Sequence, residues 1–172
     1  MKQKRPLLPL FSVVFVDMLG FGLILPLLPY IAANWGARPA IIGLIGAAYP
    51  LGQFFGAPLV GLFSDRFGRK PLLLFSIAGT FLSLLMLGFA RSIPMIMISL
   101  FLDGLTGGNI TVAQAYIADV TDEKNRAKGM GMIGAAFGLG FILGPASGGF
   151  LSQWGYAVPA FFSAGLSLIN LF

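Results

Sequence analysis

Residues 61–71 read GLFSDRFGRKP and separate two apolar blocks, each long enough to cross a bilayer as a helix. Gly61 would let helix ends pack closely, and Gly68 would allow a tight turn between the two helices. Asp65 and Arg69 would lie at the membrane surface, where their charges can pair and hold one conformation of a moving bundle. The same string also fits an ordinary basic loop that only anchors the topology. Either way, it predicts a short charged connection between two membrane helices.

The rest of the chain has the composition of a membrane protein. Of its 172 residues, 57% are hydrophobic and only 10% are charged, whereas roughly a quarter of the residues of a soluble domain are charged. The apolar residues fall in blocks of about twenty, which become helices because lipid offers no partner to backbone amides. We expect an all-α transmembrane fold, a single six-helix bundle over residues 1–172, with helices at about 7–33, 40–63, 71–90, 94–118, 128–152 and 157–172.

Lys and Arg are distributed unevenly between the two ends of this expected bundle. Arg38 and Arg91 would lie at one end, and the other nine of the eleven basic residues at the opposite end. Because cytoplasmic loops carry the excess of Lys and Arg, we expect a multi-pass protein of the cell (inner) membrane with a cytoplasmic N-terminus. The net charge of +5 is then an orientation signal. The expected partner is the lipid bilayer, and nucleic acid is not expected. The nine residues are Lys2, Lys4, Arg5, Arg66, Arg69, Lys70, Lys124, Arg126 and Lys128.

An internal repeat links the second and fifth blocks. Residues 46–64 read GAAYPLGQFFGAPLVGLFS and residues 134–152 read GAAFGLGFILGPASGGFLS, at a constant offset of 88 residues with no gap. Two glycine-rich helices can also look alike by composition alone. If the repeat is real, its two copies run in opposite directions across the membrane. The sequence therefore predicts two inverted three-helix repeats, which is how many transporters are built.

A carboxylate, Asp17, lies inside the first apolar block. A charge in a membrane helix is costly, so it usually faces a cavity or a partner and marks function. Asp17 is about ten residues into the helix, or roughly 15 Å from its start at 1.5 Å per residue. Burial disfavours the charged form of a carboxyl group, which suits a proton carrier. The alternative is that Asp17 lies near the cytoplasmic interface and is simply hydrated.

The fourth block, residues 94–118, is unusually polar. Thr106, Asn109 and Gln114 could line a substrate path, with Gln53 of the second block opposite them. Equally, these side chains could form hydrogen bonds between helices that only hold the bundle together. The sequence alone leaves the two interpretations even.

The charged connection resembles the signature loop of the major facilitator superfamily, G-x-x-x-D-R-x-G-R-[RK]. The resemblance implies that this loop gates the conformational change. It also implies that Arg69 pairs with Asp119 at the end of the fourth block, and that Asp65 caps a helix of a C-terminal half. The matching residues are Gly61, Asp65, Arg66, Gly68, Arg69 and Lys70.

Residues 140–149, GFILGPASGG, look like the G-x-x-x-G-P-x-x-G-G motif of antiporters in the same superfamily. Small residues four apart make a groove for a neighbouring helix, and a proline inside a helix allows a kink. The alternative is a packing face with no link to the direction of transport. The motif residues are Gly140, Gly144, Pro145, Gly148 and Gly149.

Three strings together resemble tetracycline-efflux-like members, which exchange a drug for a proton. These are D-x-x-G-x-G-L-x-x-P-x-x-P from Asp17, Q-F-x-x-A-P-x-x-G-x-x-S-D-R-F-G-R from Gln53, and A-Y-I-A-D ending at Asp119. Two positions depart from the family pattern. Leu100 stands where a basic residue thought to serve proton transfer is common, and Ser83 stands where tetracycline exporters carry an Asp. The second departure argues against tetracycline as the substrate.

The resemblance implies a twelve-helix protein of which this chain supplies one half. The sixth block stops at Phe172, short of a comfortable span, so we expect a truncation or a fragment. The expected function is the N-terminal half of a proton-coupled exporter of small hydrophobic drugs, working by alternating access with a C-terminal half or a second copy. The alternatives are a structural half-bundle without transport activity and a nutrient uptake symporter. With no Cys, no His and no phosphate-binding loop, we expect no enzyme, catalytic residue, metal or cofactor.

Overall fold

The computed structural model describes residues 8–171, and in that range every regular element is a helix. The elements are α1 (Leu8–Ile24), α2 (Leu28–Asn34), α3 (Pro39–Phe67), α4 (Arg69–Gly88), α5 (Ile93–Thr106), α6 (Asn109–Val120), α7 (Glu123–Leu151), the short 3-10 turn η1 (Ser152–Trp154) and α8 (Ala157–Asn170). Five apolar segments are long enough to cross a membrane, and α8 is a sixth, shorter one of 14 residues. The expected all-α bundle of membrane helices is confirmed. Lys2, Lys4, Arg5, the expected start at Leu7 and the end at Phe172 lie outside the described residues.

The first and fourth spans are each broken, where the sequence predicted continuous helices. Residues 25–27 form a turn between α1 and α2. Pro26 lies in this turn and Pro29 is the second residue of α2, because proline has no N–H to bond within a helix but fits its first turn. In the fourth span, Gly107 and Gly108 separate α5 from α6. Glycine favours helices least of all residues except proline, so the break falls there.

Two of the loops between the spans, those that join α3 to α4 and α6 to α7, are shorter than predicted. Gly68 alone joins α3 to α4, with a φ of 97° that side chains other than hydrogen strongly disfavour. The helix expected to begin near residue 128 begins at Glu123, because the Asp122 carboxylate accepts a hydrogen bond from the backbone N–H of Asn125 (3.0 Å) and so caps it. The basic residues Arg126 and Lys128 are therefore exposed on the first turns of α7.

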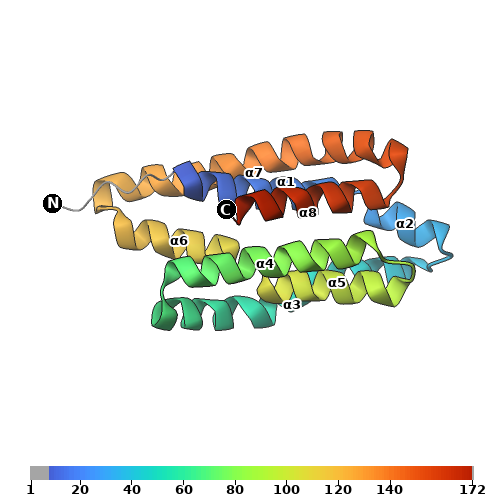
Figure 1. Ribbon diagram of the computed structural model, residues 1–172, viewed down its shortest axis with the longest axis horizontal. Coiled ribbons are helices and arrows are strands. Elements are labelled where there is room, and N and C mark those ends of the chain that lie inside the picture. Colours follow the sequence, from blue (N-terminus) through green and yellow to red (C-terminus); the bar gives the residue numbers. More distant parts are fainter. Residues whose placement is uncertain (1–7, 172) are drawn as a thin grey trace.

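The helices pack in a pattern that is unchanged when the two halves of the chain are exchanged. Helix α1 packs along α7, as α3 packs along α5, and α4 packs on α5 as α8 packs on α1. The α4–α8 contact is its own equivalent. Figure 1 shows these long helices side by side along the long axis of the molecule. The contacts are those expected of two inverted three-helix repeats.

Glycines make both of the closest helix pairs possible. A Cβ at Gly52 or Gly56 of α3 would overlap the backbone of α5 at Phe101 or Leu105. The repeat-equivalent glycines of α7 do the same against α1, since a Cβ on Gly140 would lie 2.9 Å from the Leu19 nitrogen and one on Gly144 2.7 Å from the Gly22 Cα. Close backbone approach at small residues is the usual way that membrane helices pack.

Both ends of the bundle agree with the expected distribution of charge. The α3–α4 and α6–α7 junctions lie at one end of the molecule, and the α2–α3 and α4–α5 junctions lie at the other (Figure 1). Arg66, Arg69 and Lys70 are therefore at the first end, whereas Arg38 and Arg91 are at the second.

Candidate functional site

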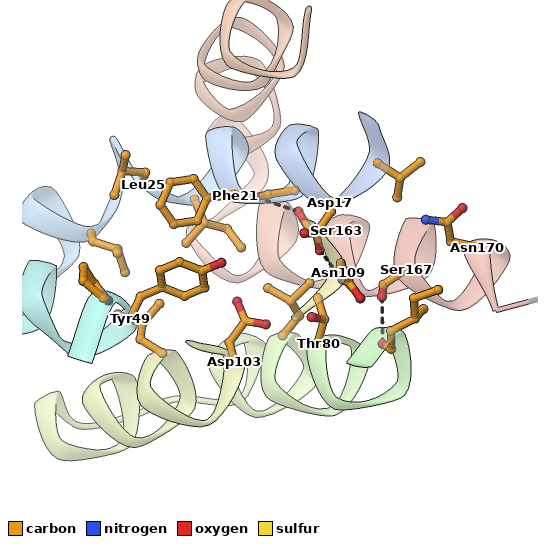
Figure 2. Close-up of a pocket in the computed structure, with 18 of the residues that line it drawn as sticks. Asp17, Phe21, Leu25, Tyr49, Thr80, Asp103, Asn109, Ser163, Ser167 and Asn170 are labelled. Carbon is orange, nitrogen blue, oxygen red and sulfur yellow. Dashed lines mark hydrogen bonds between the residues drawn. The ribbon is translucent and has the colours of Figure 1, made fainter. Parts of the chain in front are cut away.

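A cavity of about 190 Å³ lies inside the bundle, between α1, α3, α4, α5, α6 and α8. Most of its wall is apolar, but polar side chains from all six of these helices reach it (Figure 2). They are Asp17, Tyr49, Thr80, Asp103, Asn109, Ser163, Ser167 and Asn170. The cavity lining, which falls entirely among the described residues, includes no Lys or Arg. An acidic chamber with apolar walls is therefore the candidate site.

Asp17 and Asn109 meet across the cavity. Asn109 is the first residue of α6 and is 1% exposed. Its side-chain Nδ2 donates a hydrogen bond of 2.9 Å to Asp17 Oδ1 on α1 (Figure 2). The break at Gly107 and Gly108 starts α6 here and so places Asn109 next to α1. Two residues selected from the sequence are thus joined by one hydrogen bond, and each comes from one of the two broken spans.

Asp103 of α5 is a second carboxylate at the cavity, which the sequence reasoning did not select. Its side chain lies near Thr80 of α4 and within electrostatic range of Asp17. Tyr49 of α3 lies within the same range of both carboxylates. The signal that marked Asp17, an acidic residue inside an apolar block, was present for Asp103 as well.

Aromatic and aliphatic side chains form the rest of the wall. The rings of Phe21 and Tyr49 have centroids 4.9 Å apart and are tilted by 44°. Leu100, at the position where the family resemblance predicts a basic residue, is 6% exposed and lines the cavity. Ser83, the other departure, is 5% exposed and does not line it. The apolar side chain at residue 100 therefore brings no positive charge to the cavity wall.

Helix α8 contributes polar groups that bond to neighbouring backbones. Ser167 Oγ donates to the Ile77 carbonyl oxygen at 3.1 Å, and Asn170 Nδ2 donates to the Val13 carbonyl oxygen at 3.2 Å. These bonds tie α8 to α4 and α1 at the side of the cavity. Their donors are therefore occupied in holding the chamber together.

The two glutamines expected along a substrate path lie elsewhere. Gln53 of α3 is half-buried and Gln114 of α6 is exposed, and neither lines the cavity. Asn109 is thus separated from both of the residues with which the sequence grouped it. Thr106 is half-buried, and its hydroxyl donates to the Leu102 carbonyl oxygen at 2.9 Å.

The charged connection forms a compact cluster at the end of the bundle. Arg69 Nε donates to Asp119 Oδ2 at 2.8 Å, which is the pairing that the resemblance implies. The same guanidinium pairs through Nη1 with Asp65 Oδ1 at 2.6 Å and donates to Ser64 Oγ at 2.5 Å. One arginine therefore joins α3, α4 and the end of α6.

The other residues of the connection lie outside this cluster. Arg66 lies over the Phe67 ring, with its guanidinium carbon 5.6 Å from the ring centroid, and Lys70 is exposed. A Cβ at Gly61 would meet nothing within 4 Å. The close packing expected at Gly61 is therefore not made within the described part of the bundle.

The α7 motif is divided between two faces of its helix. Gly140, Gly144 and Gly148 pack against α1, whereas Gly149 faces open space. Pro145 lies inside α7, which continues as a helix through it. The packing role expected of this motif is seen for three of its four glycines.

Among the described residues, no group of three or more His, Cys, Asp or Glu side chains could hold a metal ion.

The fold and the polar chamber between inverted repeats are those of a membrane transporter. Residues 10–172 match the Major Facilitator Superfamily, and the chain belongs to this family. It is 39% identical over 161 residues to the class B tetracycline resistance protein of Escherichia coli, and 36% identical over 169 residues to multidrug resistance protein 2 of Bacillus subtilis.

These alignments cover 92% and 98% of this chain but 40% and 42% of the relatives, so the chain spans less than half of their length. A human organic anion transporter, MFSD10, superposes with a TM-score of 0.82 at 30% identity, over 96% of this chain and 46% of that one. A D-xylose-proton symporter superposes with a TM-score of 0.75 over the same shares. At 19% identity, this second match shows the fold alone.

Proposed function

We propose that this chain is the N-terminal half of a proton-coupled secondary transporter that exports small hydrophobic drugs by alternating access. The observation that carries the proposal is the acidic cavity between the two inverted repeats, with Asp17 bonded to Asn109 inside it. Substrate sites of transporters with inverted repeats lie at the repeat interface near the bilayer midplane. The chamber therefore lies where a transported molecule would bind.

Asp17 is the group best placed to carry the proton. Its hydrogen-bond donor is the neutral amide of Asn109, and the cavity lining holds no basic side chain. A charge enclosed by apolar walls without a counter-charge is costly. A proton or a bound substrate would remove this cost, so binding of either would stabilise the chamber relative to its empty state. Such competition at one carboxylate couples the movement of a proton to that of a substrate.

The Arg69 cluster supplies the gate in this proposal. Its ion pairs to Asp65 and Asp119 hold α3, α4 and α6 together at one end. Asp65 and Asp119 are both exposed, with side chains 65% and 54% accessible. A second six-helix unit, either a C-terminal half or a second copy, could bind Asp65 in one conformation and release it in the other.

The drug class and the export direction rest on the relatives and on the α7 motif. Two relatives are named for resistance to tetracycline or to several drugs, and export from the cytoplasm is what such resistance requires. We propose the inner membrane as the location, with the N-terminus in the cytoplasm, in agreement with the basic end of the bundle. In these roles the chain moves small molecules and protons and catalyses no covalent reaction.

Proton-coupled transport is tested in proteoliposomes that contain this chain and an imposed pH gradient, with radiolabelled phenethylamine, a single-ring hydrophobic amine, and tetracycline as probes. We expect gradient-dependent phenethylamine movement that Asp17→Asn abolishes, because the variant keeps the shape and hydrogen-bonding capacity of residue 17 but cannot exchange a proton. Glu123→Gln, which removes an exposed acidic group at the start of α7, is the matched control and should leave transport unchanged.

Undiminished gradient-driven movement in Asp17→Asn would show that Asp17 does not carry the proton. If the unmodified chain inserts correctly yet moves neither probe, it is a half-bundle that does not transport alone. The oligomeric mass in nanodiscs then tells whether a second copy was present.

A further inference from the structure

We propose that Asp103, together with Asp17, makes the cavity a binding site for protonated amines that carry a ring-sized apolar group. This inference deepens the proposed function and rests on its premise that the cavity is the substrate site. It adds a substrate class and a residue that selects it. Three independent features of the chamber lead to it: its charge, a buried acceptor without a hydrogen-bond partner, and its walls.

The charge of the chamber is negative. Asp17 reaches it from α1 and Asp103 from α5, and the two carboxylates are close enough to interact electrostatically. No Lys or Arg is among the lining residues, and Leu100 fills the wall between apolar neighbours. Two acidic groups in a low-dielectric chamber repel each other and favour any cation that enters between them. An organic anion would face the opposite cost.

One buried hydrogen-bonding group of the chamber is an acceptor without a partner among the described residues. Asn109 Nδ2 donates to Asp17, and this bond assigns the nitrogen end of the amide, because a carboxylate oxygen can only accept from it. Asn109 Oδ1 is then left buried without a hydrogen-bond partner among the described residues, in a side chain that is 1% exposed and lines the cavity. A buried acceptor without a partner costs stability. A ligand N–H group would satisfy it, which an ammonium with hydrogens offers and a quaternary one does not.

The walls suit an aromatic or compact aliphatic body. Phe21 and Tyr49 form a tilted aromatic pair (Figure 2). The aliphatic side chains of Ile24 and Leu84 also line the cavity. An ammonium near such rings gains a cation–π attraction. The volume of about 190 Å³ slightly exceeds that of an engineered apolar cavity of about 150 Å³ that holds benzene. The chamber therefore accommodates one ring and its amine.

The inference separates this chain from a relative of the same fold. The human relative with the TM-score of 0.82 is titled an organic anion transporter. The two carboxylates of this chamber predict the reverse preference here. Charge selection by the cavity can therefore be tested by comparing the affinities of two ligands of similar shape and opposite charge.

The test is calorimetric titration of the purified chain in detergent at mildly alkaline pH, with phenethylamine and 3-phenylpropionate as probes. We expect the amine to bind and the carboxylate to bind at least roughly tenfold more weakly. Asp103→Asn should weaken amine binding by roughly tenfold or more, since removing one partner of a buried charge pair has effects of this size or larger. Asp103→Glu should retain most of the affinity, and the control Glu123→Gln should retain all of it.

A second measurement needs no variant. Phenethylamine should protect Asp103 of the unmodified chain from modification by a hydrophobic carbodiimide, as read by peptide mass spectrometry, whereas phenylpropionate should not. Equal amine affinity in Asp103→Asn and the unmodified chain, tighter binding of phenylpropionate, or modification of Asp103 at an unchanged rate would each overturn the inference.

The binding test and the transport test fail separately. Amine binding that depends on Asp103, without gradient-driven movement of any probe, would overturn transport by this chain alone and keep the amine site. Gradient-driven movement that depends on Asp17, with an amine affinity that does not change in Asp103→Asn, would support the proposed transport and overturn the amine site.

Discussion

Asn109 occupies the first position of α6, and its amide is the hydrogen-bond donor to Asp17. A neutral amide can satisfy a carboxylate without cancelling its charge, which a lysine or arginine would do. Asp17 therefore stays available to a proton or a cationic ligand. The choice of residue at position 109 thus affects both the stability of the bundle and the chemistry of the chamber.

The first residue-scale prediction concerns this hydrogen bond. Asn109→Ala should lower the free energy of unfolding by about 1–3 kcal/mol, because it leaves a half-buried carboxylate in an apolar chamber without its donor. Gln114→Ala is the matched control, since Gln114 lies on the same helix but is exposed. Thermal unfolding in detergent measures both variants. Equal midpoints for the two would show that the Asn109–Asp17 bond contributes no stability.

Asp17 and Asn109 were predictable from the sequence because an acidic or amide side chain inside an apolar span needs a partner. Gln114, which the sequence groups with Asn109, does not line the same cavity. The two are five residues apart, and this spacing turns a helix by about 140° beyond one full turn, so they face different directions. Gln53 lies one turn beyond Tyr49, where α5 closes against α3, since a Cβ on Gly104 would lie 2.9 Å from the Gln53 nitrogen. Their roles in transport stay predictions.

At the scale of the elements, glycines determine which helices meet. Gly56 and Gly144 are equivalent in the two repeats, and each lies against the backbone of a neighbouring helix, at Leu105 and Gly22. Gly43 and Gly131 are also equivalent by the same offset, but a Cβ on either would meet nothing within 4 Å. The sequence alone does not distinguish these four glycines, but only two of them contact a neighbouring helix.

Alanine substitutions at these positions test the packing directly. Gly56→Ala and Gly144→Ala should each destabilise the bundle by about 1–3 kcal/mol, because the added methyl group forces two backbones apart. Gly43→Ala and Gly131→Ala should be neutral or stabilise by up to about 1 kcal/mol, since alanine favours a helix over glycine. Unfolding midpoints of the four variants give the comparison. Similar shifts at all four sites would contradict the packing described here.

The helical spans were predictable to within a few residues, but their internal breaks were not. The length of an apolar segment predicts that it crosses the membrane. It does not predict a turn within the segment after which the chain continues in the same direction. Pro26 and Pro29 marked one break, and the pair Gly107 and Gly108 marked the other. Proline and glycine are frequent in membrane helices without breaking them, so these signals did not decide the matter in advance. Pro145, inside a continuous α7, shows the contrary case.

At the scale of the whole molecule, the two ends of the bundle differ in charge and should lie on opposite sides of the membrane. The chain contains no cysteine, so single cysteines can be introduced without a background. Ser92→Cys and Ala127→Cys place exposed thiols at opposite ends. We expect a membrane-impermeant maleimide to label residue 92 in intact cells and residue 127 only after permeabilisation, because the basic end faces the cytoplasm. The reverse pattern would overturn the proposed orientation.

The exchange symmetry of the helix contacts could be anticipated only in part. The gap-free offset between residues 46–64 and 134–152 predicted that α3 and α7 are equivalent. The equivalence of the first and fourth spans left no such trace in the sequence. The helix contacts reveal this equivalence. Gly52 of α3 packs at Phe101 of the fourth span, and its repeat equivalent Gly140 of α7 packs at Met18 of the first span. Contacts between backbones preserve the relationship where side chains have diverged.

Gly68 has a mechanical consequence. Helices of 29 and 20 residues meet at this one residue, and a residue has only two soft torsions. The pair therefore behaves as two stiff rods on a single pivot, and Arg69, the first residue of the second rod, is clamped to Asp65 near the end of the first. A small rotation at the pivot becomes a displacement of several ångströms at the far tip of each rod. Whatever loosens the clamp gains the leverage of both.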